Sequence, residues 1–281
     1  MFSWSFASAE LKLVIELFMK SRLLVLIMIL LPCVALRAQF TDSSSGLLQS
    51  PTALMKSEGT FMITNNFLNL HSLPTSGWRY NTFGYGFNIT FWSRFEVGYV
   101  CTIFDGKRKP DPTDRDLIMF NQDRHFTGKF QLLKEGEFGL KWMPALAVGI
   151  SDPTTASSEN GYIDANVSGT GNGYFNRMYL ALSKSFNTPW GYLGAHLGYQ
   201  YNRRSDYHIN APFAGVNFRP KWVQDFYYLD YVDLIAEFDS RTFNIGMIAS
   251  VWENRFELMF ELQNLRWINF GARFLLKLKN T

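Results

Sequence analysis

The sequence predicts an all-β fold: a transmembrane antiparallel up-and-down β-barrel of about twelve strands, with ten to fourteen allowed by the pattern. Short segments alternate apolar and polar residues almost without a break from residue 60 to residue 278. The last two segments, 256–262 and 268–278, alternate most regularly. Because successive side chains of a strand point to opposite faces, each strand would have one apolar and one polar face. Behind a secretion signal, this pattern is typical of an outer-membrane barrel with lipid outside and a polar lumen.

The first 38 residues form the predicted secretion signal. A short basic region at 20–22 precedes an apolar run at 23–36 and a small residue at the expected cleavage point. Met19 would begin a signal peptide of more usual length than Met1 does. The alternative is one anchoring transmembrane helix, but the apolar run falls short of the roughly 20 residues that a bilayer requires, and a proline interrupts it.

Composition narrows the classes of partner and site. The signal carries four basic and two acidic side chains, so the formal net charge falls from +3 for the whole chain to +1 after cleavage. A nearly neutral chain gives no reason to expect nucleic acid as a partner. Cys101 is the only cysteine that remains, which excludes a disulfide framework and a cysteine metal site. Aromatic residues make up 17% of the chain, which suits the aromatic girdles of an outer-membrane barrel.

Residues 39–58 are expected to form a periplasmic or lumen-entering lead-in. Pro51 cannot donate to a sheet ladder, and no period-two alternation runs through this stretch. The predicted organisation is therefore a signal peptide at 1–38, the lead-in at 39–58 and the barrel at 59–281.

Twelve candidate strands follow the lead-in. In the second, aromatic and aliphatic side chains occupy the odd positions, while Gly, Asn and Thr occupy the even ones. In the fifth, Pro144 is a misfit that would require a bulge or a gap in the ladder. The candidate strands are 60–69, 81–91, 94–103, 124–134, 140–151, 174–186, 191–201, 212–219, 230–238, 242–251, 255–262 and 267–278.

The connections between these strands alternate in length. If the first strand rises from the periplasm, the long polar connections at 104–123, 152–173 and 202–211 all fall outside the cell. Those on the periplasmic side are mostly tight, although 220–229 is long. Short periplasmic turns and longer outer loops are the known asymmetry of outer-membrane barrels.

The final strand carries an assembly signal. Outer-membrane barrels resemble one another in a last strand of polar–x–Gly–x–x–hydrophobic–x–hydrophobic spacing, which the barrel assembly machinery reads. Asn269, Gly271, Phe274 and Leu276 match this spacing. The tail 277–281 departs from it, because it does not end in an aromatic residue.

Charged and polar side chains gather on the predicted inner face. Opposite charges on neighbouring strands would fill a small barrel with cross-strand ion pairs, each contributing about 0.2–1 kcal/mol. The other interpretation is a channel lining past which a hydrophilic polymer slides, since twelve strands enclose more space than side chains alone fill. The candidate lumen-lining residues are Lys141, Arg177, His196, Asp233, Glu237, Glu257, Glu261, Arg273 and Lys277.

Catalysis is poorly supported. Barrel hydrolases need a histidine with a serine or aspartate partner, and none of the four histidines lies in a recognisable motif. We expect no catalytic residue, metal site or cofactor, with a lipid-acting enzyme that depends on His196 or His208 as a third hypothesis. Tryptophan and tyrosine at the strand ends are interpreted as an interfacial girdle, and stacking on sugar rings is the alternative.

Residues 46–55, followed by Glu58 and Gly59 before the first strand, resemble the opening motif of the YjbH family of outer-membrane proteins. The family usually has arginine where this chain has Leu54. The resemblance implies a role in exopolysaccharide production. Fuller members carry two barrels with periplasmic material between them, whereas this chain has room for one, which puts the transport role in doubt more than the fold. Later strands of the family are similar to 212–216, 236–240 and 267–271.

We therefore expect a Gram-negative outer-membrane barrel that takes part in export or assembly of a surface exopolysaccharide, without catalysis of its own. Polymer passage would rely on the inward polar residues, with Gly46, Pro51, Thr52 and Ala53 as gate or plug. The expected partners are outer-membrane lipid, the barrel assembly machinery, a polysaccharide and periplasmic export proteins. The alternative is a structural barrel subunit that anchors a secretion or gliding complex in the outer membrane.

Overall fold

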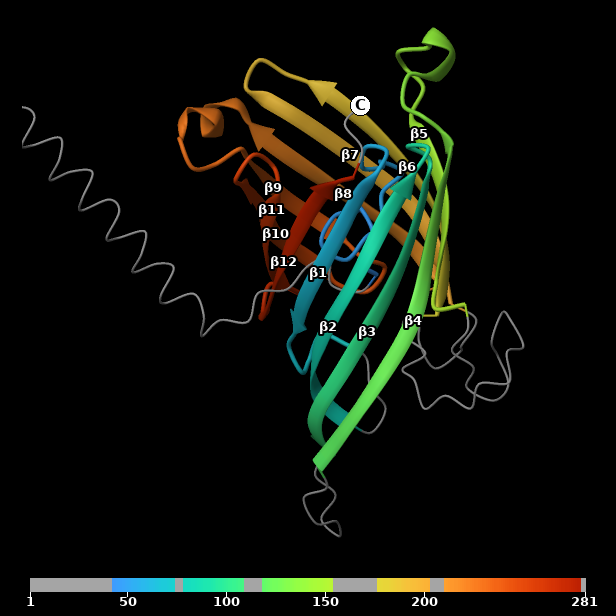
Figure 1. Ribbon diagram of the computed structural model, residues 1–281, viewed down its shortest axis with the longest axis vertical. Helices are drawn as coiled ribbons and strands as arrows, with labels where there is room; N and C mark the ends of the chain where they lie inside the picture. Colours follow the sequence, from blue (N-terminus) through green and yellow to red (C-terminus); the bar gives the residue numbers. More distant parts are fainter. Residues whose placement is uncertain (1–41, 74–77, 109–117, 154–175, 203–209, 279–281) are drawn as a thin grey trace, which may run out of the picture. The chain divides into compact units, whose positions relative to one another are not determined.

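The described part of the chain is a closed antiparallel barrel. The computed structural model describes residues 42–73, 78–108, 118–153, 176–202 and 210–278, so the predicted signal peptide lies outside it. Within these ranges twelve strands pair in sequence order, and β12 closes the wall against β1 (Figure 1). The predicted all-β barrel and its strand number are confirmed. The strands are β1 (Thr60–Leu68), β2 (Trp78–Phe91), β3 (Phe95–Arg108), β4 (Ile118–Leu133), β5 (Ala145–Ser151), β6 (Arg177–Asn187), β7 (Gly191–Tyr201), β8 (Ala211–Pro220), β9 (Tyr231–Phe238), β10 (Phe243–Val251), β11 (Phe256–Gln263) and β12 (Trp267–Lys277).

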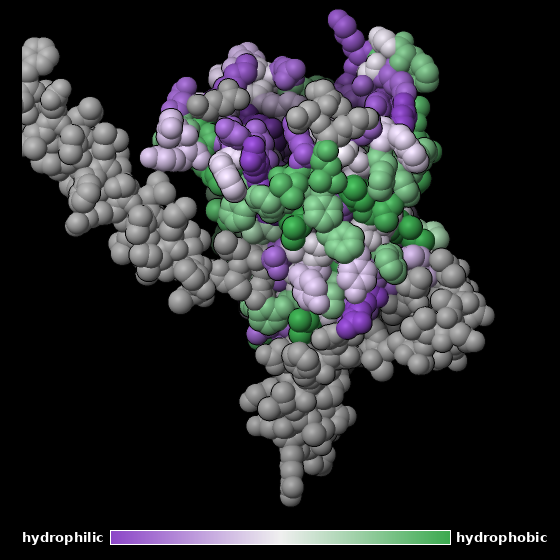
Figure 2. Space-filling model, viewed as in Figure 1, coloured by the Kyte–Doolittle hydropathy of each residue, from purple (hydrophilic) through white to green (hydrophobic). Residues whose placement is uncertain are grey.

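The alternation of the sequence becomes the two faces of the wall. In β11, Glu257, Met259 and Glu261 are buried inside the barrel, while Phe260 between them is exposed on the outside. The outer face is correspondingly apolar, and Figure 2 shows a hydrophobic band across the visible wall with hydrophilic side chains above it. Because period two is imposed by the pleat itself, the parity read from the sequence holds in strand after strand.

The fifth strand begins later than its pattern predicts. β5 starts at Ala145, so Pro144 lies just before it and interrupts no ladder. A proline at this position needs no bulge, because it has no strand partner to lose. The register shift in this region falls instead in β4, between Gln131 and Leu133.

The predicted connection at 104–123 is also wrong in extent. β3 continues to Arg108 and β4 begins at Ile118. Together with β2, which begins at Trp78, they are longer than the other strands (Figure 1). Most of the predicted connections at 152–173 and 202–211 lies outside the described residues.

Three tight turns, at 92–94, 188–190 and 252–255, lie at the end of the barrel that is uppermost in Figure 1. In the β2–β3 hairpin, Trp92 and Ser93 both have φ of 51°, and the Arg94 N–H donates to the Phe91 carbonyl at 3.0 Å. Positive φ at both central residues is the turn geometry that matches the twist of paired strands. We call this the short-turn end, and the opposite one the long-connection end.

Candidate functional site: a lumen filled by the N-terminal segment

Residues 42–58, which we call the plug segment, fold inside the barrel (blue in Figure 1). All residues from Asp42 to Ala53 are buried except Gly46, which is partly buried. Gly46 and Pro51 form an antiparallel bridge, and the Leu47 N–H donates to the Ser50 carbonyl at 2.9 Å, so that 46–51 is a tight turn. Of the two positions that the sequence left open for this stretch, the described residues therefore take the lumen.

Lys129 of β4 binds the plug segment both before and after its tight turn at 46–51. Its Nζ donates to the carbonyls of Ser45 and Leu54, each at 2.8 Å, and to that of Thr52 at 3.3 Å. Glu96 of β3 lies 3.6 Å from the same Nζ and accepts from the Ser45 N–H and hydroxyl at 3.1 and 2.6 Å. Both charged side chains are fully buried, so each depends on the other and on the plug for its stabilisation.

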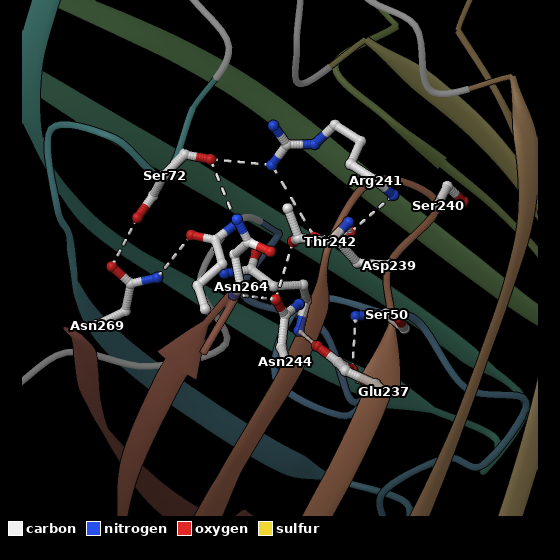
Figure 3. Close-up of polar contacts among 12 residues, drawn as sticks. Ser50, Ser72, Glu237, Asp239, Ser240, Arg241, Thr242, Asn244, Asn264 and Asn269 are labelled. Carbon is white, nitrogen blue, oxygen red and sulfur yellow. Dashed lines mark hydrogen bonds and ion pairs between the residues drawn. The ribbon is translucent and has the colours of Figure 1, made fainter. Parts of the chain in front are cut away.

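Two more carboxylates hold the turn of the plug from the opposite wall. Glu237 of β9 accepts from the backbone N–H groups of Gln49 and Ser50 at 2.7 and 3.2 Å (Figure 3). Glu261 of β11 accepts from the Gln49 side-chain amide at 2.8 Å. Backbone donors that a tight turn leaves without partners are thus satisfied by the wall.

The tip of the turn is seated on two glycines of the wall. A Cβ added to Gly215 of β8 would stand 2.4 Å from Leu47 Cδ1, and one added to Gly246 of β10 would stand 2.8 Å from Leu48 Cδ1. Both leucines are buried. The missing side chains therefore make the recesses into which the leucines fit.

Ala53, which follows the tight turn of the plug, binds the plug to β4 and β6. Its N–H donates to Ser183 Oγ at 2.8 Å, its carbonyl accepts from the Gln131 amide at 2.6 Å, and its methyl group packs in a small apolar cluster. The other members of the cluster are Ala145, Ala147, Tyr179, Ala181 and Phe213, with Leu54 packed against them.

A chain of polar contacts runs from Ser183, the partner of Ala53, along the inner face of the wall. Ser183 Oγ lies 2.8 Å from His196 Nδ1, and His196 Nε2 lies 3.0 Å from Asn217 Oδ1. The Asn217 amide donates to Asp233 at 3.1 Å, and Asp233 accepts two hydrogen bonds from Arg219, from Nε at 2.9 Å and Nη2 at 2.5 Å. The plug backbone is thereby linked to an arginine near the short-turn end.

The first described residue of the plug is tied by an ion pair. Arg177 Nη2 donates to the Asp42 carboxylate at 2.6 Å, and the Ser151 hydroxyl donates to its other oxygen at 3.0 Å. Both ion-pair partners are buried. This contact fixes the start of the described plug to the junction of β5 and β6.

The last turn of the plug meets Glu257 of β11. This carboxylate accepts from Lys56 Nζ at 2.8 Å and from the Tyr231 hydroxyl at 2.6 Å, and Arg273 Nε lies 2.7 Å from its second oxygen. Because Glu257 and Arg273 are direct partners in the β11–β12 ladder, this is a cross-strand ion pair of the expected kind.

Ser72 and Arg241, from the connections after β1 and β9, meet Asn269 of β12 at the long-connection end (Figure 3). Ser72, after β1, donates its hydroxyl to Asn269 Oδ1 at 2.8 Å, and its carbonyl accepts from Arg241 Nη2 at 2.9 Å. The Asn269 amide donates in turn to Glu261 at 2.7 Å. The polar position of the predicted assembly signal is therefore also part of the lumen network.

Two polar cavities remain beside the plug. The mouth cavity, of about 610 Å³, opens at the short-turn end, and the inner cavity, of about 240 Å³, lies against Thr52, Leu54 and Met55. Lys56, Arg219, Tyr231 and Glu257 line both, so the two cavities adjoin.

The structure brings most of the predicted lumen residues to the inner face. Lys141 is not among them: it is exposed in the connection before β5, because the strand starts only after Pro144. Lys277 is exposed at the end of β12, on the rim of the mouth cavity. The predicted residues that lie buried on the inner face are Arg177, His196, Asp233, Glu237, Glu257, Glu261 and Arg273.

Sequence reasoning missed Glu96 and Lys129, the pair with the most contacts to the plug. They are direct partners in the β3–β4 ladder. The signal that could have found them is a pair of opposite charges on the predicted inner faces of two consecutive strands, 94–103 and 124–134.

His196, one of the two histidines of the third hypothesis, takes part in the attachment of the plug. Ser183 Oγ beside His196 accepts from the plug backbone and is buried, which makes it a tether for the plug. His71 is exposed and stacked on Trp267, and His208 lies outside the described ranges. No group of three or more His, Cys, Asp or Glu in the described ranges is placed to hold a metal ion. Among the same residues, no helix is both long and apolar enough to cross a membrane.

Comparison with known proteins gives one family. The model of the YjbH family, described as exopolysaccharide biosynthesis protein YbjH, matches residues 42–277. The match begins at the first described residue of the plug and ends with β12, so it covers the plug and the barrel together. No curated protein sequence matches the chain significantly.

Proposed function

Since the chain belongs to the YjbH family of exopolysaccharide biosynthesis proteins, we propose that it is an outer-membrane barrel that takes part in export or assembly of a surface exopolysaccharide. It acts without catalysis of its own. Its plug segment closes the lumen at rest and moves aside to let a hydrophilic polymer pass.

The observation that carries this proposal is the kind of contact that holds the plug. Around the lumen, Glu96, Lys129, Ser183, Glu237 and Glu257 bind it through hydrogen bonds and ion pairs. Water or saccharide hydroxyls can replace such bonds, each of which contributes a net of about 0.5–1.5 kcal/mol between neutral groups and about 1.5–3 kcal/mol where one group is charged. A plug held in this way closes the lumen and can still leave it.

The outer face supports a position in a membrane. Each of the five connections at the short-turn end carries one exposed tryptophan, and the wall beside them is apolar. Tryptophan concentrates at membrane–water interfaces, where its ring is apolar and its N–H is polar. Outer-membrane lipid and the barrel assembly machinery are accordingly proposed partners, with periplasmic export proteins at the short-turn end. The five residues are Trp92, Trp142, Trp190, Trp222 and Trp252.

Conductance in planar lipid bilayers tests the proposal. We compare the purified mature protein with a variant that lacks residues 39–58. The intact protein should conduct little or intermittently, and the deletion should conduct steadily, because the lumen of a twelve-stranded barrel is wider than its own side chains fill. A circular dichroism spectrum rich in β-structure serves as the folding control for both.

The outcomes separate two roles. Steady conductance that appears only on deletion supports a plugged export pore. If neither form conducts although both are folded and inserted, passage through the lumen is refuted and an accessory or anchoring role replaces it.

A further inference from the structure

We propose that the two cavities beside the plug form a binding site for a negatively charged sugar residue of the uronate type. This inference rests on the proposed role in exopolysaccharide export and names the class of polymer. The mouth cavity, of about 610 Å³, lies in the size range of small-molecule sites, about 300–1,000 Å³, and the inner cavity adds about 240 Å³ beside it.

Arg219 is fixed as a ready donor at the junction of the cavities. Its guanidinium carbon lies 3.6 Å from the centre of the Tyr231 ring and 5.9 Å from that of Tyr192. Two of its nitrogens, Nε and Nη2, are held by Asp233, while Nη1 has no hydrogen bond to any residue that the structure describes, and the side chain is 35% exposed. A planar guanidinium presents several N–H donors in a rigid fork, and this geometry matches a carboxylate.

Arg273 adds a second guanidinium on the wall of the inner cavity. Its Nε forms an ion pair with Glu257 at 2.7 Å. Glu257 already accepts from Lys56 and Tyr231, so a single carboxylate faces two cations. The positive charge is therefore incompletely balanced where the two cavities meet.

The lining of the two cavities as a whole also carries a net positive charge. Two acidic residues, Glu253 and Glu257, line the cavities, and Asp233 stands behind Arg219, so the basic side chains exceed the acidic ones by two. An anion is stabilised by such an excess more strongly than in open water, because the walls exclude part of the solvent. The basic lining residues are Lys56, Arg219, Arg255, Arg273 and Lys277.

The neutral groups of the mouth favour a sugar over a bare anion. Ser57, Thr60 and Asn254 line the mouth cavity beside the cations, and hydroxyl and amide groups both donate to and accept from sugar hydroxyls. A uronate unit would place its carboxylate on Arg219 and its hydroxyls on these groups. Because Lys56 belongs to the plug, such a ligand would contact the plug directly.

Binding of a six-residue oligogalacturonate to the full mature protein in detergent tests the proposal, with maltohexaose as the neutral match. Isothermal titration calorimetry should give a dissociation constant at least ten-fold lower for the oligogalacturonate. Arg219→Gln should raise that constant about ten-fold, the effect of one charged hydrogen bond. The double variant Arg255→Gln/Lys277→Gln changes only exposed lining residues and should raise it about three-fold, with no effect on folding.

The matched control is Arg94→Gln/Lys221→Gln, which removes two charges from the same end of the barrel but from outside both cavities. It should change the constant less than two-fold. Equal binding of the two oligosaccharides, or equal loss in the control and the lining variants, would overturn the site. Competition by inorganic phosphate at the same concentration as the oligogalacturonate would refute the preference for a sugar.

Transport and binding fail separately. Oligogalacturonate binding to a protein that never conducts would keep the site and remove the pore. Conductance after removal of the plug, with no preference for oligogalacturonate over maltohexaose, would keep the pore and remove the site.

Discussion

Lys129→Met should release the plug. The Lys129 ammonium contacts three plug carbonyls and Glu96, and both charged groups are fully buried in the closed lumen. Removing one partner of a buried ion pair typically costs about 3–5 kcal/mol, since the remaining charge stays uncompensated. When the plug leaves, water reaches Glu96, so this cost falls on the closed state alone. At about 1.4 kcal/mol per decade, the open fraction should rise roughly 10²–10⁴-fold.

Conductance per inserted barrel measures the open fraction, and cleavage of the plug by an added protease gives an independent readout. The control is Glu96→Gln/Lys129→Met, which removes both charges of the pair. Because no uncompensated carboxylate is left, its open fraction should be at least ten-fold smaller than that of the single variant. A Lys129→Met protein that is folded, and as closed and protease-resistant as the wild type, would refute the anchoring role of Lys129.

Two further predictions concern the seat of the plug and a surface turn. Gly215→Ala should raise conductance, because its methyl group would overlap Leu47 and overpacking costs about 1–3 kcal/mol. Adding Leu47→Ala should restore the closed lumen. A Gly215→Ala protein with unchanged conductance would contradict the role of Gly215 as a recess for Leu47. In the β4–β5 connection, partial burial acts to raise the pKa of Glu135, but hydrogen bonds from Ser185 and Lys184 outweigh it and lower this pKa below its ordinary value of 4.5. The ionised carboxylate therefore stabilises the fold fully above pH 4.5, the ordinary pKa, and this contribution disappears as the pH falls through the lowered pKa. Thermal unfolding should show Glu135→Gln slightly less stable than wild type at neutral pH, by about 0–1 kcal/mol, with the difference lost in acid; a difference that grows in acid would contradict the sign.

The strands could be predicted from the sequence because their signal is local. Alternation such as that of 256–262 is imposed by the pleat, whatever lies elsewhere in the chain. The wrong start predicted for β5 has the same origin. The apolar residues continue at every second position through Trp142 and Pro144, but the hydrogen-bonded pairing with β6 begins only at Ala145. Parity alone also placed Lys141 inside, and the late start of β5 leaves it in an exposed connection.

The site was less predictable, because its contacts join distant parts of the chain. Gln49 meets Glu261 and Ala53 meets Ser183 across the lumen, and nothing in the local pattern around either residue marks its partner. The absence of alternation in 39–58 separated this stretch from the strands, yet it could not decide between the lumen and the periplasm. The recess at Gly215 was equally hidden, since a glycine on the polar parity of a strand looks like any other inward position.

With a neutral imidazole, the polar chain from the plug to Arg219 has one arrangement of hydrogens that satisfies every member. The Ala53 N–H donates to Ser183, whose hydroxyl donates to Nδ1 of the imidazole, and Nε2–H donates to the Asn217 oxygen, whose amide faces Asp233. The ring is thereby set in a single neutral tautomer. From Ala53 to Asp233 the donors point the same way, so their dipoles align head to tail, and Arg219 donates to Asp233 from the other side. His196, in the middle of the wall, therefore connects the backbone of the closing segment with the charged pair at the entrance.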